Sequence, residues 1–453
     1  MTRKHILLLI LIIIIPFFGK SQDRLSFTEV EQKTIDLYYT SQWDSLIIVG
    51  NIGLKSGHDY FYLRLRMGVA YFYQEKYTKA ITQLEKARSY NSQDDFTNSY
   101  LYLSYKYSGR TADAEAIGKI LSDTLKTQPM FKKTPLFSGA YLEFGVSPSS
   151  NYTPTPLPRT SENVYETSTK SNTLNYGFIG LTNQLTSWLT VFYGYTSLGT
   201  SATKTTFEKQ LPPLIPKLIT TESDIIVTQN QFYVNPRIRL AKGLVLATYF
   251  HKINNKSVLQ KGSMASTDTT LLFNDGILGI SLEKYYRNFV FVGEVSNNNL
   301  NNTNHLQTSI GVTWFPLSNL NLYFSTMYSA NSAKGPARLF PTNYDKSKSF
   351  YLLKAGGKLT GKLWGEVAYY GGNIQDSQIA NGFLFFNTPN KYTMMTNATL
   401  TLVLKKIKVS LKYQYSSLTS DKESAKMTTP NIIEYSNYSF QKQTITGGLL
   451  WNF

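Results

Sequence analysis

Histidine is the side chain that most often acts as a catalytic base near neutral pH, and this chain has only four: His5, His58, His251 and His305. His251 and His305 lie in the second half of the chain, where either could face outward as the base of a hydrolase or an acyltransferase. Neither is accompanied by a Ser or Asp at a recognisable catalytic spacing. We therefore expect no enzyme, and we keep hydrolysis or acyl transfer through these two histidines as an alternative.

The sequence contains no recognisable cofactor-binding motif either. No glycine-rich phosphate loop, metal-ligand cluster or paired-carboxylate motif stands out. The absence of cysteine excludes a disulfide framework and any thiolate metal site. We expect no cofactor and no bound metal.

Basic residues at alternate positions carry the strongest chemical signal. In a strand, such residues share one face. They are Arg237, Arg239, Lys354, Lys358, Lys408 and Lys412, and the acidic residues that could share that face are Glu143, Glu283, Glu294 and Glu366. Unpaired, the basic side chains would line a path that favours anions or an acidic polymer. Paired with the glutamates, they would hold a closed barrel together.

The elements that position these residues are strands, because a period of two begins after Pro135. The segment from Lys406 to Ser416 shows it best. Its apolar face carries Ile407, Val409, Leu411, Tyr413 and Tyr415, and its polar face carries Lys408, Ser410, Lys412 and Gln414. Segments of about ten residues with this alternation, separated by turn residues, are typical of an outer-membrane barrel, and we count about fourteen of them.

The connectors between these segments alternate in length, as short periplasmic turns and long external loops do. Short connectors are predicted at Asn183 to Ser187, Ala241 to Gly243, Tyr285 to Asn288, Pro316 to Asn319, Thr360 to Lys362 and Lys405. Long connectors are predicted at Ser149 to Asn172, Gly199 to Ser223, Asn255 to Thr270, Asn331 to Lys346, Gln375 to Thr388 and Thr419 to Ile433. The stretches Ser296 to Asn304 and Asp421 to Lys426 suggest flexible loops or solvated turns.

The end of the chain agrees with a barrel. Leu449, Trp451 and Phe453 lie on one face of the last predicted strand. This ending resembles the C-terminal signal that directs outer-membrane proteins to the barrel-insertion machinery. A soluble β-sandwich also alternates, but 33 Tyr, 26 Phe and 5 Trp suit aromatic girdles at two membrane interfaces better.

Upstream of the strands, the chain repeats itself at a helical period between Asp23 and Thr127. The clearest copy carries Arg64, Met67, Gly68, Tyr71, Tyr77, Ala80, Leu84 and Ala87. This spacing resembles the tetratricopeptide (TPR) signature, and an offset of about 34 residues gives a second and a third copy. The first copy has Gly50 and Gly53 where the family packs an apolar residue and an alanine, so it could be a degenerate cap.

The resemblance to TPR proteins implies a concave groove that binds a protein partner. Its positions fall on Tyr62, Leu65, Val69, Phe72 and Tyr73. The chain's own neighbouring repeat or the barrel could cover them instead.

A leader precedes these two parts. Arg3 and Lys4 come before an uncharged run from Ile6 to Phe18, and small residues stand at Gly19 and Ser21. We expect a signal peptide over residues 1–21, a periplasmic TPR-like domain over 22–134 and an outer-membrane barrel over 135–453. The fold class is α+β multidomain, with a short α-helical domain followed by an antiparallel transmembrane barrel.

Most of the formal net charge of +17 lies after residue 134. In an exported chain this charge suggests anionic lipid or lipopolysaccharide, an anionic solute or an anionic polymer as the partner, and not nucleic acid. A merely solvated basic surface is the alternative.

The chain as a whole is similar in architecture to outer-membrane proteins that fuse TPR repeats to a barrel, as in exopolysaccharide exporters and the YaiO-type family. Those exporters carry longer repeat arrays. The resemblance implies a non-enzymatic barrel for transport or export whose periplasmic repeats recruit a protein partner. A scaffold subunit of an outer-membrane assembly or secretion machine, with a closed barrel, is the alternative.

Overall fold

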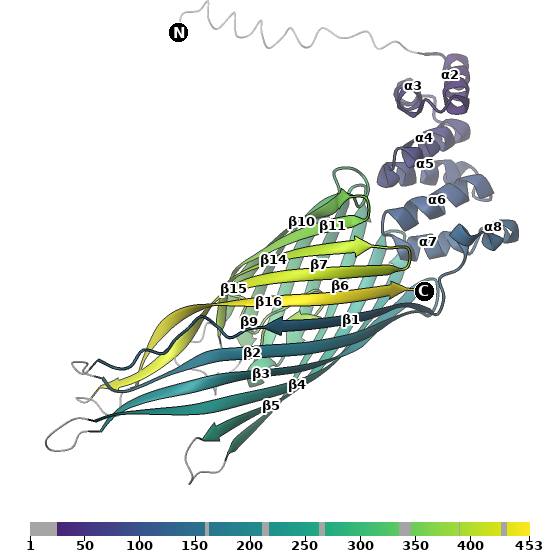
Figure 1. The fold of residues 1–453 in the computed structure, drawn as a ribbon. Helices are drawn as coiled ribbons and strands as arrows, with labels where there is room; N and C mark the ends of the chain where they lie inside the picture. The colour runs from purple at the N-terminus through teal and green to yellow at the C-terminus, as the bar shows by residue number, and fades with distance from the viewer. Residues whose placement is uncertain are drawn as a thin grey trace, which may run out of the picture.

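In the described part of the chain, seven helices are followed by a closed antiparallel β-barrel (Figure 1). The computed structural model describes residues 25–158, 163–210, 217–261, 268–334, 346–388, 390–426 and 433–453. The predicted leader, residues 1–21, lies outside the described residues. None of the helices in the described ranges is both long and apolar enough to cross a membrane.

The helices form pairs that recur along the chain. They are α2 (Phe27–Tyr39), α3 (Trp43–Lys55), α4 (Phe61–Tyr73), α5 (Tyr77–Tyr90), α6 (Asp95–Tyr107), α7 (Thr111–Gly118) and the short α8 (Asp123–Thr127), and the 3-10 turn η2 (Pro129–Phe131) follows. The helices α2, α4 and α6 begin 34 residues apart, and so do α3, α5 and α7. Ser26 begins the first helix with a capping box, in which its side chain and that of Glu29 each bond the other's backbone N–H.

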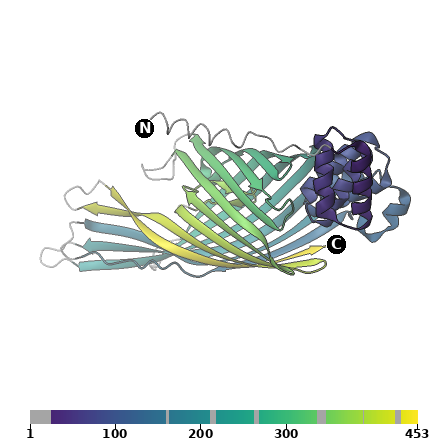
Figure 2. The same cartoon turned by 90° about the horizontal axis from the view of Figure 1, so that it is seen from above.

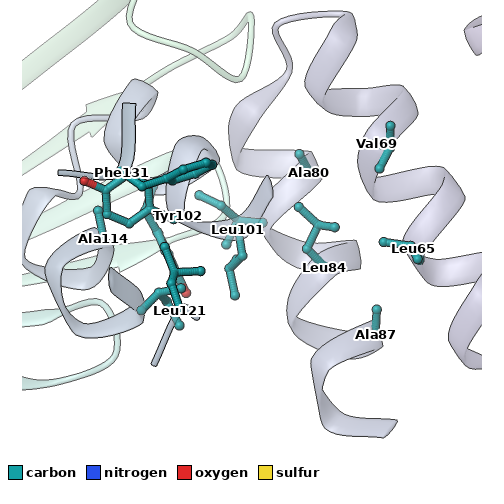
Figure 3. Packing of buried hydrophobic residues seen from close by; sticks show 13 residues of the cluster. Leu65, Val69, Ala80, Leu84, Ala87, Leu101, Tyr102, Ala114, Leu121 and Phe131 are labelled. Carbon is teal, nitrogen blue, oxygen red and sulfur yellow. The ribbon is translucent and has the colours of Figure 1, made fainter. Parts of the chain in front are cut away.

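Two buried clusters hold the helix pairs together. The larger one contains Leu65, Val69, Leu84 and Leu101 (Figure 3). Gly68 allows α4 and α5 to approach closely, because a Cβ at this position would lie 2.6 Å from the Leu84 side chain. The helices therefore pack as the periodicity predicted.

Gly50 and Gly53 in the first copy have the same effect. A Cβ on Gly50 would lie 2.7 Å from the Met67 sulfur, and one on Gly53 would lie 2.6 Å from Val30. These glycines make room for the large side chains of Met67 and Val30.

Fourteen strands close the barrel. They are β1 (Phe137–Ser147), β2 (Asn163–Gln184), β3 (Leu189–Gln210), β4 (Lys217–Ala241), β5 (Leu244–Lys261), β6 (Thr269–Tyr286), β7 (Phe289–Asn298), β8 (Asn304–Trp314), β9 (Leu322–Lys334), β10 (Ser347–Thr360), β11 (Leu363–Gly372), β14 (Lys391–Val403), β15 (Ile407–Lys426) and β16 (Ile433–Asn452). Each strand pairs with its neighbours in the chain, and β1 closes the ring on β16 through the pairs Gly139↔Asn452 to Val146↔Ile445. The predicted number of strands is confirmed.

The alternation along each strand sorts the side chains as predicted. On β4, Phe232 and Leu240 point outward and are 49% and 52% exposed, whereas Tyr233 and Asn235 point inward and are 3% and 6% exposed. Outward positions on the other strands are also large and apolar. Examples are Phe144, Ile179, Leu278, Ile310, Val367 and Leu411, all of them exposed.

All six predicted short connectors are confirmed, and they lie at the end of the barrel where the helices sit (Figures 1 and 2). Four of the predicted long loops are wrong, because the strands continue through much of them. These loops were expected at 149–172, 199–223, 255–270 and 419–433, where β2, β3, β4, β5, β6, β15 and β16 are strand. The Thr- and Ser-rich segments keep their period of two, and Thr favours extended backbone.

The strands are therefore uneven in length. β4 has 25 residues and β7 has 10, so one side of the barrel projects beyond the other (Figure 1). The projection is closed by a pairing of β15 with β2 through Glu423↔Thr167 and its neighbours. The segment Asp421 to Lys426, expected to be a loop, is part of this strand.

The predicted long loop at Gln375 to Thr388 is also wrong as an external loop. It connects β11 to β14 and folds back into the barrel, where it forms the small hairpin β12 (Gln378–Ile379) and β13 (Leu384–Phe385). Asp376, Ser377 and Gln378 are 0% exposed. We call residues 374–386 the plug.

The helical domain rests on three of the short turns. The Thr78 backbone N–H donates to the Ser318 carbonyl at 3.0 Å, and the Asn319 amide donates to the Glu75 carbonyl at 3.0 Å. On the turn between β4 and β5, Lys242 pairs with Glu85 at 2.6 Å. The domain therefore covers the rim above the β4 to β9 side of the barrel (Figure 2).

Candidate functional site: a plugged lumen

Within the described part of the chain, polar side chains from many strands converge in the lumen. Its wall carries hydroxyl and amide groups on alternate positions of β4 to β10. Buried examples are Gln231, Asn235, Ser281, Ser296, Gln307, Ser309, Ser329 and Asn331. A buried polar group is costly unless it is hydrogen-bonded, and the plug supplies many of the partners.

Gln378 at the start of β12 is the centre of the plug's hydrogen bonds. Its amide nitrogen donates to the Glu294 carboxylate at 2.6 Å and to the Tyr249 hydroxyl at 3.0 Å. Its backbone N–H and carbonyl are both bonded to the Gln307 side chain, at 2.9 and 2.7 Å. One plug residue is thus bound by β5, β7 and β8.

An ion pair holds the plug from the opposite wall. The Lys348 ammonium on β10 donates to the Asp376 carboxylate at 2.8 Å, and both side chains are within 1% of complete burial. The Asn301 amide donates to the other Asp376 oxygen at 2.7 Å. A buried pair of this kind is strongly destabilised when one partner is removed.

Both barrel histidines point into the lumen, whereas the hydrolase or acyltransferase alternative considered that either could face outward. His251 is 1% exposed, and its Nδ1 lies 2.7 Å from the Gly382 carbonyl oxygen of the plug. The His305 Nε2 lies 4.0 Å from the Asp376 carboxylate. The polar face of each strand is the lumen face, which is why these side chains turn inward and contact the plug.

Aromatic rings complete the fit of the plug to the wall. Phe383 lies against Phe178, Phe192 and Tyr233, with ring centroids 5.1, 6.0 and 5.2 Å away. The plug is therefore held by apolar contacts as well as by hydrogen bonds.

The plug backbone is strained at three non-glycine positions. Asp376, Ala380 and Asn381 have φ angles of 54°, 56° and 56°, in the left-handed region that costs a residue such as Ala about 1 kcal/mol or more. Such conformations persist where the surroundings hold them, and they gather at functional and switching segments.

The predicted basic lumen residues separate into two groups. Arg237 pairs with Glu283 at 2.7 Å, and Lys354 pairs with Glu366 at 3.3 Å. Arg239 lies at the rim, where its partner at 2.7 Å is Asp113 of the helical domain. Pairing with carboxylates thus accounts for half of the predicted set.

Lys358, Lys408 and Lys412 form the second group. Lys358 and Lys408 are exposed and Lys412 is half-buried. Lys408 and Lys412 lie on β15, away from the turns that the helices contact. Lys358 lies on β10 beside one of those turns, where its backbone N–H donates to the Asn321 carbonyl at 2.9 Å. Of the other predicted acidic residues, Glu294 binds the plug, and Glu143 accepts a hydrogen bond from the Tyr176 hydroxyl at 2.6 Å.

The predicted groove residues are only partly available. Leu65 and Val69 are 9% and 0% exposed because they belong to the helical core (Figure 3), so for these two the chain's own neighbours provide the cover. Tyr62 and Tyr73 are 57% and 54% exposed, and Phe72 is half-buried. Tyr73 stacks on Trp43 with ring centroids 5.0 Å apart.

Further exposed aromatic residues flank these positions on α2, α4 and α6, the first helices of the three helix pairs. Together we call them the aromatic strip: Tyr39, Tyr62, Tyr73, Phe96 and Tyr107, each at least 45% exposed. Tyr39, Tyr73 and Tyr107 are the last residues of α2, α4 and α6.

Leu449, Trp451 and Phe453 share the outward face of β16, with exposed fractions of 37%, 47% and 48%. The Trp451 and Phe453 rings stack at 5.4 Å. This is the face that the alternation predicted for them. Among the described residues, no group of three or more His, Asp or Glu side chains could hold a metal ion.

Sequence reasoning missed the plug and its anchors, Gln378, Asp376 and Lys348. One signal was present: Phe383 to Phe386 is a run of four apolar residues inside a segment expected to face water. Such a run in an external loop is out of place unless something covers it. The Asn-rich stretch at 296–304 was also interpreted as a simple loop, although Asn301 binds Asp376.

No family model matches this chain, and no curated protein matches it. Solved structures with a similar fold exist. The toluene transporter TodX of Pseudomonas putida has a TM-score of 0.42 and 10% identity, with 70% of this chain and 91% of that chain covered. A FadL homologue of Pseudomonas aeruginosa has a TM-score of 0.40 and 8% identity, covering 70% and 90%.

An outer-membrane channel of Pseudomonas putida F1 has a TM-score of 0.35 and 7% identity, covering 72% of this chain and 99% of that chain. At such low identity and structural similarity, these likenesses assign neither a family nor a function to this chain.

Proposed function

We propose that this protein is an outer-membrane transport barrel whose lumen is closed by a displaceable plug. The observation that carries the proposal is the chemistry of the plug's seat: besides the apolar contacts of Ile379 and Phe383, the plug is held by a network of hydrogen bonds and one buried ion pair with polar groups of the wall. Water can replace such contacts, whereas it cannot replace the packing of an apolar core. A polar-walled barrel with a polar-anchored plug suits a path that opens and closes.

The outward face supports a membrane location. Large apolar side chains cover it, lipid suits them, and water does not. The short turns, the start of β1 and the end of β16 lie at one end of the barrel, which in such barrels is the periplasmic end. In this orientation the helices lie in the periplasm, and lipid and lipopolysaccharide surround the barrel.

The helical stack would recruit a periplasmic protein. Its 34-residue period and close glycine contacts support three TPR repeats, the last of them with the short α7. The aromatic strip offers exposed rings of the type that are enriched at interfaces. Lys408 and Lys412, on the uncovered side of the barrel, together with Lys358, would attract an anionic solute or polymer toward the lumen.

The first experiment measures conductance in a planar bilayer for the wild-type protein and for a variant in which a short Gly-Ser linker replaces residues 374–386. We expect the wild type to be mostly closed and the variant to conduct steadily. Lys348→Met should give frequent openings, because it leaves the Asp376 carboxylate buried without its ammonium partner. Heat-modifiable migration on a gel checks that each barrel is folded.

Lys408→Glu with Lys412→Glu in the plug-deleted protein tests the charge of the path. Loss of anion preference is expected. A folded, plug-deleted barrel that never conducts would refute transport. It would favour the second candidate function, a scaffold subunit, which the filled lumen and the exposed aromatic strip support. Tyr62→Glu with Tyr73→Glu should then release the periplasmic partner and leave the barrel folded.

A further inference from the structure

The hairpin of β4 and β5 contacts both the helical domain and the plug. Its tip is the short turn at 242–243, on which the domain rests, and its two arms run along the lumen wall past the plug. It therefore touches the two parts of the molecule that the proposed function assigns to partner recruitment and to closure.

Asp113 of α7 holds the tip. Its carboxylate accepts hydrogen bonds from the Arg239 Nε at 2.7 Å and from the Gly243 backbone N–H at 3.1 Å, and the side chain is 5% exposed. Arg110 pairs with the same carboxylate at 2.6 Å. A buried carboxylate with three donors is a specific seat that cannot shift without losing charge-assisted hydrogen bonds.

The two arms bind adjacent residues of the plug, Asn381 and Gly382. Tyr233 on β4 and His251 on β5 are register partners, with rings 5.3 Å apart. The Tyr233 hydroxyl donates to the Asn381 carbonyl at 2.8 Å, and the His251 Nδ1 lies 2.7 Å from the Gly382 carbonyl oxygen. The strained residues Ala380 and Asn381 lie beside these two contacts. The two arms therefore bind the plug where a change of conformation would relieve backbone strain.

The ladder between the two arms is interrupted between the tip and these contacts with the plug. Pro236 has no N–H to donate, and the paired register runs from Val234↔Phe250 directly to Arg237↔Ala247. Across this gap the Asn235 side-chain amide donates to the Thr248 carbonyl at 2.8 Å. The arms can shear most easily here, so the position of the tip controls the spacing of Tyr233 and His251.

We propose that the β4–β5 hairpin couples the seat of the helical domain to the plug, so that a partner bound to the helices loosens the plug by shifting Asp113 away from the tip. This inference rests on the proposed function. In the absence of a partner, the Asp113 seat keeps the barrel closed.

The test uses the absence of cysteine in the natural chain. Ile379→Cys places a single thiol in the plug, where the native side chain is 2% exposed, and its rate of labelling by a water-soluble maleimide reports plug opening in proteoliposomes. Asp113→Asn and Arg239→Gln, each in this background, should raise the labelling rate about fivefold or more, the usual lower range of coupling between sites.

Asn319→Ala is the matched control. It removes another contact between the helical domain and the barrel, the 3.0 Å bond to the Glu75 carbonyl, on a turn that does not belong to the hairpin. It should leave the labelling rate unchanged. An equal rise for Asn319→Ala and Asp113→Asn would overturn the route through β4 and β5.

Tyr233→Phe separates failure of this inference from failure of the proposed function. It removes a plug bond directly and should raise labelling by itself. If Tyr233→Phe opens the plug and Asp113→Asn does not, the coupling is wrong and the plugged transport barrel stands. The double variant Tyr233→Phe, Asp113→Asn should raise the labelling rate by less than the product of the two single fold increases. An increase equal to that product would also reject the hairpin as the route of coupling. Heat-modifiable migration confirms that every variant is folded.

Discussion

Individual polar residues decide where the plug sits. Asp376 is completely buried and bonded to Lys348 and Asn301, and its neighbours in the plug find partners on other strands. A buried ion pair adds little net stability compared with apolar packing, but it penalises every arrangement in which one charge loses its partner. These contacts therefore specify the position of the plug more than they strengthen the barrel.

At the same scale, one ion pair in the helices predicts a pH dependence. Arg66 binds Glu31 through two hydrogen bonds of 2.8 and 3.0 Å. The guanidinium lowers the pKa of Glu31 below its ordinary value of 4.5. Because the folded pKa is depressed, the stabilisation is complete above about pH 4.5 and is lost as the pH falls through the folded value.

We therefore expect hydrogen exchange in α2 to accelerate as the pH falls below about 4.5, after correction for the intrinsic exchange rate. The effect should be about 1 kcal/mol, because the pair is only partly buried and solvent still screens it. Glu31→Gln should flatten the pH dependence of exchange in α2. Glu29→Gln disturbs only the capping box with Ser26 and should retain the part of the pH dependence that is due to Glu31. An unchanged profile in Glu31→Gln would contradict the assignment.

At the scale of elements, close approach between helices depends on residues without side chains. Gly68 lies where α4 and α5 meet, and any Cβ there would overlap Leu84. The barrel strands obey a different rule, in which alternation decides which side chains face the lumen. Each rule is local, and each was readable from the spacing of a few residues.

Gly68→Leu should destabilise the helical stack by about 1–3 kcal/mol, the usual cost of overpacking a core. Hydrogen exchange of the α4 and α5 amides in the full-length protein would measure this loss. The matched control is Lys79→Leu, which introduces the same residue at an exposed position of α5 and should change exchange little. Equal protection in both variants would show that the helices do not meet at Gly68.

At the scale of the whole molecule, closure of the barrel joins the two ends of the sheet. The pair Gly139↔Asn452 lies at the last residues of β16, so the strand that is predicted to carry a C-terminal insertion signal also completes the ring. Phe453 projects outward beside Trp451.

Deletion of Phe453 should reduce severalfold the amount of heat-modifiable protein in the outer-membrane fraction, because the insertion machinery would lose the terminal aromatic residue. Asn452→Ala is the control, since it keeps the outward face of Leu449, Trp451 and Phe453. If the deletion and the wild type reach the membrane equally, the outward face of β16 is not an insertion signal.

The sequence by itself determined the order of the elements, the number of strands and the face of each strand that turns inward. A period of two and a period of 34 are properties of neighbouring residues, and local backbone geometry converts them directly into strands and helix pairs. The same reasoning placed Tyr233 on the inner face, where it is 3% exposed. It stopped the strands too early, because Ser- and Thr-rich segments resemble loops in composition although they keep the alternation of strands.

Only the tertiary structure decided what fills the lumen and where the helices sit. Gln378 is bound by residues 71 to 129 positions away in the chain, and Asp113 meets Arg239 from 126 positions away. No local pattern encodes such pairs, because each depends on how the whole ring closes and brings its inner faces together. The plug and the seat of the helical domain are for this reason properties of the closed barrel.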